Sequence, residues 1–198
     1  MRITGSITRS VIAASLTVIV SIAAGSTTRA GSPQGEEMKR ITIEANARGT
    51  STQLGRTVGV TIIINEFSTA DDQAALLQAF KAKGSQGLAN ALGKMHAKGR
   101  IAIPGTLGYD LNYIRQFQTP TGTRIRFVTD RPIRMAENWA DSRSSQYNLS
   151  AGEIDIPTSG DSTGTLMPSC QLSLDKEKQL QLKAFQNPWT LINIRVNN

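Results

Sequence analysis

The sequence predicts a mainly β domain (α+β), an antiparallel β-sandwich or partly closed barrel of about eight or nine strands with an inserted helical hairpin. Three observations lead to this prediction. Short segments that alternate apolar and polar residues recur along the chain, separated by turn residues at short spacing. Helical spacing of apolar residues is confined to one stretch, at about 69–97. The regular strand–helix alternation of a doubly wound sheet is missing from the sequence.

Residues 1–30 have the pattern of a secretory signal peptide. Arg2 and Arg9 precede an apolar run at 11–24, and small residues follow before Gly31. An uncleaved anchor is the alternative, although a run of about 14 residues is short for a membrane span. We therefore expect a secreted or periplasmic protein with one domain at 31–198.

The first two strands are predicted at 38–47 and 57–67. Ile41, Ile43 and Ala45 alternate with polar residues in the first segment, which is the period of a half-buried strand. The second segment is rich in β-branched residues, which favour strands.

The helical hairpin is predicted to begin at Ser68, with Asp71 completing a capping box. The first helix should stop at Gly84, a residue suited to a helix end. Ser85 is then expected to cap a second helix, whose apolar residues recur at helical spacing.

The segment 107–133 is predicted to be a central β-hairpin. Its turn is Thr119-Pro120-Thr121-Gly122, because proline presets φ and glycine tolerates positive φ. The alternation places Tyr109, Leu111, Tyr113, Arg115 and Phe117 on one face. If four residues form the loop, Ile114, Ile125 and Phe127 share the other face, and a bulge at Gly122 would change that pairing.

Further strands are expected at 100–103, 153–156, 165–174, 179–185 and 190–196, with a helical turn at 135–141 that carries Trp139. The single cysteine, Cys170, excludes an intramolecular disulfide and is expected to be a small buried apolar residue.

Charge and composition exclude several functions. The formal charge of +7 includes three arginines in the predicted leader, and without it 19 basic and 15 acidic residues leave +4. This mild excess does not predict nucleic-acid binding. One histidine, His96, and one cysteine cannot form a zinc site, and no Gly-x-Ser-x-Gly nucleophile motif occurs. His96 is expected to cap the second helix. No catalytic, metal-binding or cofactor-binding residue is predicted, and no cofactor.

The best candidate site is the aromatic and basic face of the central hairpin. Such a face could bind an anion, a sugar or an envelope polymer through stacking and bidentate hydrogen bonds, and the alternative is a solvated face whose arginines cover the rings. The candidate ligand-binding residues are Tyr109, Tyr113, Arg115, Arg124 and Arg126.

Three functional hypotheses follow. The first is an exported non-enzymatic domain of the envelope or extracellular space that binds a small ligand or partner on this face. The second is a metal-free hydrolase that uses Asp110 and Asp130 as an acid–base pair, and turn capping or pairing with Arg131 and Arg134 is the alternative role of these carboxylates. The third is a structural envelope protein without a ligand.

A set of short motifs lies between about residues 56 and 156. The motifs are Phe67-Ser68-Thr69, Leu76-Leu77, Phe80-Lys81-Ala82-Lys83-Gly84, Ala91-Leu92, Met95, Leu107-Gly108-Tyr109-Asp110-Leu111, Tyr113-x-Arg115-Gln116 and Thr129-Asp130-Arg131-Pro132-Ile133. On these motifs the chain resembles a family of secreted bacterial proteins of unknown function, and it departs from the family pattern at 135–139. The resemblance implies export and one domain, and it carries no known activity.

Overall fold

The computed structural model describes residues 39–135, 147–174, 180–185 and 187–197. All of them belong to one compact unit, Pro33–Asn198. The predicted leader at 1–30 and most of the predicted helical turn at 135–141, including Trp139, lie outside the described residues.

The described residues form one helix-containing segment and ten antiparallel strands in a nearly closed, barrel-shaped sheet. This confirms the predicted fold class. The sheet order is β4-β3-β2-β1-β10-β8-β7-β6-β5, and β9 pairs with β8 outside that path. The elements are β1 (Ile41–Arg48), a 3₁₀ turn (Ser51–Gln53), β2 (Thr57–Ile64), α1 (Ala70–Leu92), β3 (Gly99–Ala102), β4 (Tyr109–Leu111), β5 (Tyr113–Thr119), β6 (Gly122–Thr129), β7 (Leu149–Pro157), β8 (Thr163–Leu174), β9 (Leu180–Ala184) and β10 (Trp189–Asn197).

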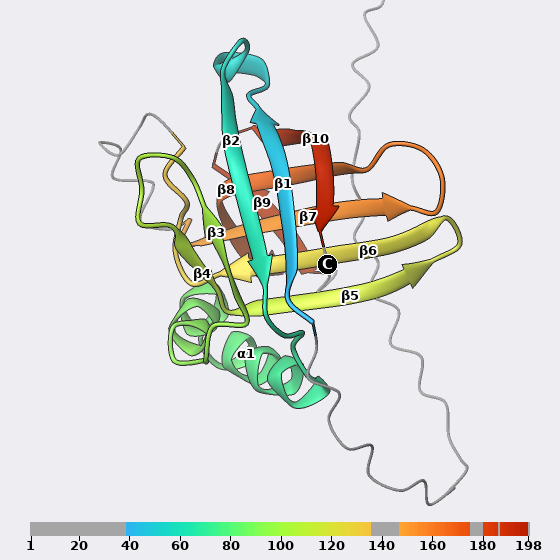
Figure 1. Ribbon diagram of the computed structural model, residues 1–198. Helices are drawn as coiled ribbons and strands as arrows, with labels where there is room; N and C mark the ends of the chain where they lie inside the picture. The colour runs from blue at the N-terminus through green and yellow to red at the C-terminus, as the bar shows by residue number, and fades with distance from the viewer. Residues whose placement is uncertain (1–38, 136–146, 175–179, 186, 198) are drawn as a thin grey trace, which may run out of the picture. The chain divides into compact units, whose positions relative to one another are not determined.

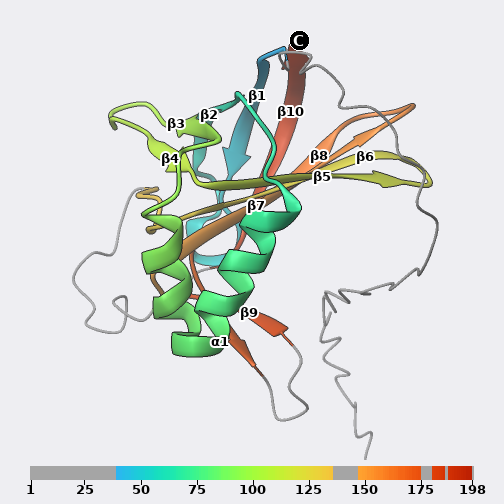
Figure 2. The same ribbon diagram turned by 90° about the horizontal axis from the view of Figure 1, so that it is seen from below.

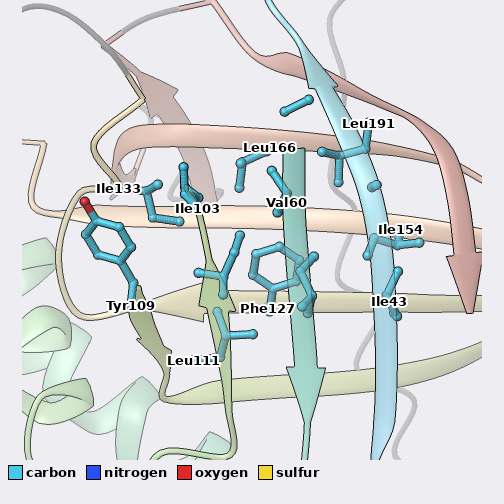
Figure 3. Packing of buried hydrophobic residues seen from close by; sticks show 14 of the residues in the cluster. Ile43, Val60, Ile103, Tyr109, Leu111, Phe127, Ile133, Ile154, Leu166 and Leu191 are labelled. Atoms are coloured by element: carbon cyan, nitrogen blue, oxygen red, sulfur yellow. The ribbon is translucent and has the colours of Figure 1, made fainter. Parts of the chain in front are cut away.

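The sheet has two halves whose strands cross steeply, as Figure 1 shows for β1, β2 and β10 over β5 to β8. Strand β10 joins them, because it pairs along β1 and only through residues 189–191 with β8. Crossed halves of this kind enclose the apolar faces of both. Figure 3 shows the resulting core, in which side chains such as Ile43 and Val60 meet Phe127 and Ile154.

One sequence prediction is wrong at the place where the chain passes from one half of the sheet to the other. The segment from Tyr109 to Phe117 is not one strand with a single alternating face, because β4 and β5 are separate strands on either side of Asn112. Leu111, Asn112 and Ile114 are all buried, so the inward and outward positions exchange at Asn112. The break also raises the strand count to ten.

The predicted helical hairpin is confirmed, and α1 consists of two segments that meet at a break (Figure 2). Lys83 and Gly84 have non-helical dihedral angles, and Gly84 has a φ of 60° that glycine adopts without strain. Gly87 lies where the segments approach, since a Cβ there would be 2.4 Å from the carbonyl oxygen of Ala79.

The predicted start of α1 is wrong by one residue. Thr69 is the N-cap, and its hydroxyl accepts from the Asp72 amide while the Asp72 carboxylate accepts from the Thr69 amide. Ser68 is buried, and its hydroxyl accepts from the amide of Ile114 in β5. Local sequence allowed either cap, and the position of β5 decided between them.

The hairpin covers one end of the outer side of the sheet. Its buried residues Leu76, Phe80, Leu88 and Leu92 pack with Cys170 in a second apolar cluster. The hydroxyl of Ser85 serves here differently from the predicted cap: it donates to Asn148 Oδ1 and accepts from the Leu172 amide, which connects the hairpin to the sheet. In the described part of the chain, α1 is not apolar enough along its length to cross a membrane.

Candidate ligand-binding face

The five residues predicted to bind a ligand do not share one face. Tyr109 points into the core, where it is 8% exposed and packs with Leu111 and Ile133 (Figure 3). Its hydroxyl accepts from the amide of Arg134. The prediction that Tyr109 and Tyr113 lie on the same face is therefore wrong, because Asn112 reverses the alternation between them.

Tyr113 lies on the outer side of the sheet, half-buried at the edge of the cluster under α1. Burial raises the pKa of its phenol, and the positive charge and hydrogen bond of neighbouring Arg115 oppose that shift. Its hydroxyl is thus neutral at physiological pH and lies beside a guanidinium.

The remaining candidates do come together. Strand alternation puts Arg115 and Phe117 of β5 on the outer face with Arg124 and Arg126 of β6, and the register sets Arg115 opposite Arg126 and Phe117 opposite Arg124. We call this surface, completed by Glu153 and Asp155 of β7, the arginine face.

The exposed aromatic ring of this face is Phe117, which is 39% exposed. The guanidinium carbon of Arg126 lies 5.4 Å from its ring centroid, and that of Arg115 lies 5.9 Å away. Both distances are within the range of cation–π attraction. The ring therefore holds two positive groups close together, and part of it remains open to solvent.

Two of the three arginines are matched by carboxylates on β7. Arg124 makes a bidentate pair with Asp155, with Nε to Oδ1 at 2.6 Å and Nη2 to Oδ2 at 2.9 Å. Arg126 donates to Glu153 through Nε. The β6–β7 register places each pair directly opposite. Their charges are largely satisfied within the sheet.

Arg115 differs from these two. Its Nη1 donates to the side-chain oxygen of Gln73 in the first turns of α1, at 3.2 Å. Within the described ranges, the structure gives Arg115 no carboxylate in ion-pair contact. Arg115 is therefore a positioned guanidinium whose charge no carboxylate of the described residues neutralises.

A shallow hollow of about 430 Å³ continues from the arginine face toward the tips of the hairpins. Sequence reasoning missed it, because its two walls come from the β5–β6 and β7–β8 turns, which only the fold brings together. We call it the threonine hollow; its lining residues are Thr119, Pro120, Thr121, Thr123, Arg124, Asp155, Ile156, Pro157, Asp161 and Thr163.

The two carboxylates of the hydrolase hypothesis lie in different surroundings. Asp110 is exposed on β4, opposite Arg100 of β3. Asp130 follows β6, and its Oδ2 would lie 3.2 Å from a Cβ added at Gly93 of the helical hairpin. Arg131 Nε is 3.8 Å from Asp130 Oδ1, so the predicted alternative of pairing with this arginine is present. Neither carboxylate lines the threonine hollow.

A second charged cluster surrounds the start of α1. Lys98 Nζ lies 3.0 Å from Glu66 Oε1 and 3.6 Å from Asp72 Oδ2. The hydrogen bond to Glu66 raises the pKa of Lys98. The hydrogen bond from the Thr69 amide lowers the pKa of Asp72; partial burial opposes this shift, and the charge of Lys98 adds to it. His96 is exposed, with Nε2 4.0 Å from Glu66, so it contacts this cluster instead of serving as the predicted helix cap.

The thiol of Cys170 is not available for chemistry. Cys170 is fully buried, as predicted, and burial raises the pKa of its thiol to about 12, so it stays protonated and unreactive. Among the described residues, no three metal-ligating side chains converge.

No protein-family model, curated protein or solved structure matches the chain. The resemblance to secreted bacterial proteins of unknown function stays a prediction.

Proposed function

We propose that this protein is an exported, non-enzymatic domain of the envelope or extracellular space that binds an anionic ligand on the arginine face. The observation that carries the proposal is the arrangement around Arg115. The guanidinium groups of Arg115 and Arg126 lie over the exposed ring of Phe117. Among the described residues, Arg124 and Arg126 have carboxylate partners, whereas the side-chain partners of Arg115, Gln73 and Tyr113, are uncharged.

An arginine side chain that is held in place has lost rotamer freedom before a ligand arrives, so less entropy is lost on binding. The planar guanidinium can then donate two parallel hydrogen bonds to a carboxylate, phosphate or sulfate group. An apolar part of the same ligand would cover the exposed part of Phe117.

Export rests on the leader pattern at 1–30 and fits a non-catalytic role, since this reading requires no intracellular cofactor. Asp110 and Asp130 lie in different surroundings and neither lines the threonine hollow, so the hydrolase hypothesis has no comparable support among the described residues.

The experiment is an NMR titration with benzoate, which combines a carboxylate with an apolar ring. We expect chemical-shift changes that centre on Arg115 and Phe117 and that fall at least severalfold in the Arg115→Gln variant. Arg48→Gln is the matched control, because it removes the same charge from an exposed position on β1.

Equal responses of the two variants would contradict the proposal, because general charge would then account for binding. If wild-type protein shows no localised shifts, the proposed site is wrong and the structural envelope protein becomes the better reading.

A further inference from the structure

The arginine face continues into a row of side chains that crosses four strands. Phe117 stands opposite Arg124, Arg124 opposite Asp155, and Asp155 opposite Thr163. Three inter-strand spacings of about 4.8 Å make this row roughly 14 Å long. A ligand that follows the row is therefore extended, and it is longer than a single ring.

The Arg124–Asp155 pair at the middle of the row can still bind a ligand. Asp155 uses Nε and Nη2 of Arg124, so the Nη1 group retains donors, and each carboxylate oxygen retains acceptor capacity. A fixed donor beside a fixed acceptor matches two neighbouring hydroxyl groups, each of which can donate and accept. Neighbouring hydroxyls of this kind are the defining feature of sugars.

The threonine hollow beside the pair has the same chemistry. Its walls carry four threonines and Asp161, and Pro120, Ile156 and Pro157 supply apolar surface between them. The hydroxyl of Thr119 is used within the turn, where it donates to the Gly122 carbonyl. Thr163, at the far end of the row, is exposed. Such a mixture suits a ring with polar edges and an apolar C–H face.

The charges argue against a uniformly anionic polymer. Arg115, Arg124 and Arg126 are balanced over the face and hollow by Glu153, Asp155 and Asp161. A polyphosphate backbone would meet one of these carboxylates, Asp155, within the row and Glu153 beside it. Arg115, which no described carboxylate pairs with, lies beside the β5 end of the row, two residues before Phe117.

From this arrangement we infer that the ligand is an acidic oligosaccharide. The carboxylate or sulfate of one sugar binds Arg115, the C–H face of a ring covers Phe117, and neutral sugars extend over Arg124 and Asp155 into the threonine hollow. The inference rests on the proposed function, and it adds the ligand class and a second subsite to it.

The test compares three probes by NMR titration: a hyaluronan tetrasaccharide, its carboxyl-reduced neutral form, and benzoate. The tetrasaccharide should shift resonances at both Arg115 and the hollow. The neutral form should shift those of the hollow and bind several-fold more weakly. In Arg115→Gln, the two glycans should bind equally.

Thr163→Val removes one hydroxyl at the end of the row while keeping the side-chain shape. We expect it to weaken both glycans several-fold and to leave benzoate binding unchanged. Ser162, next to it, provides the matched control as Ser162→Ala.

The outcomes separate the two proposals. If benzoate shifts Arg115 while neither glycan perturbs the hollow, the oligosaccharide inference is wrong and anion binding stands. If no probe shifts either part of the row, both are wrong. Glycan shifts that Thr163→Val and Arg115→Gln leave unaltered would also refute the inference.

Discussion

The two faces of the β5–β6 hairpin differ in almost every respect although their residues alternate along the same strands. The inner face carries Ile114, Ile125 and Phe127, which are at most 2% exposed. The outer face carries the aromatic ring of Phe117 and charged side chains such as that of Arg115, and all of them are at least partly accessible to solvent. One strand pair thus supplies apolar area to the core and, one residue further along, polar groups to the candidate site. We expect substitutions inside to change stability and those outside to change binding.

The largest expected effect is that of Phe127→Ala on the inner face. Phe127 packs against Gly152 of β7 so closely that a Cβ at Gly152 would be 2.1 Å from its ring. Removing the ring should lower the free energy of unfolding by about 3–5 kcal/mol, measured by urea denaturation. Phe117→Ala on the outer face is the control, with an expected loss below about 1 kcal/mol. Similar losses in both variants would show that the two faces contribute equally to stability.

The second largest expected effect on stability is at β5, the edge strand of the β5–β6 hairpin. Ser68→Ala removes the hydroxyl that accepts from the buried amide of Ile114, so we expect a loss of about 1–3 kcal/mol. Thr69→Ala removes the helix cap instead, with an expected loss of about 1 kcal/mol. Urea unfolding of both variants measures the two losses of unfolding free energy. A larger loss from Thr69→Ala would mean that the helix cap stabilises the fold more than the contact with the strand does.

The start of α1 should make stability depend on acidity. The folded-state pKa of Asp72 is lowered below the ordinary value of an aspartate, mainly by the Thr69 amide. Its contribution to stability is therefore present at neutral pH and is lost as the pH falls through the folded-state pKa. We expect Asp72→Asn to be less stable than the wild type at pH 7, with the difference shrinking below about pH 4. A difference independent of pH, in urea midpoints measured across this range, would contradict the assignment.

The smallest expected effect on stability is that of Arg126→Gln. Its ion pair with Glu153 is partly exposed, so its loss should cost about 0.2–1 kcal/mol. Glu153 also lies 3.5 Å from Arg124 Nε, so the double variant with Glu153→Gln loses this contact as well and should be slightly less stable than the single variant. A loss comparable to that of Phe127→Ala would show that the outer face also holds the fold together.

Some of these features could be predicted from short stretches of sequence. The turn at 119–122 is one, because Pro120 presets φ and Gly122 adopts its φ of 150° without strain. The helix break at Gly84 and the burial of Cys170 are others. Each depends on backbone preference or on alternation within a few residues, so local sequence contains the information.

The candidate site could be predicted only in part. Arg115, Phe117, Arg124 and Arg126 were placed together correctly, because β5 and β6 are joined by a tight turn that fixes their register. Their carboxylate partners were not foreseen, because β7 lies beyond a long connection whose length does not determine register. The threonine hollow depends on the same pairing.

The sequence by itself determined an antiparallel β domain with a helical hairpin, since hydrophobic periodicity and turn residues act locally. The tertiary structure decided which residues face solvent. Asn112 turns the chain from one half of the sheet to the other and sends Tyr109 into the core while Tyr113 stays outside. The tertiary structure also decided that Ser68 bonds to β5 and that Thr69 caps the helix. The physical reason is that burial and pairing are properties of the assembled sheet, and a one-residue change of phase at a corner reverses every side chain that follows.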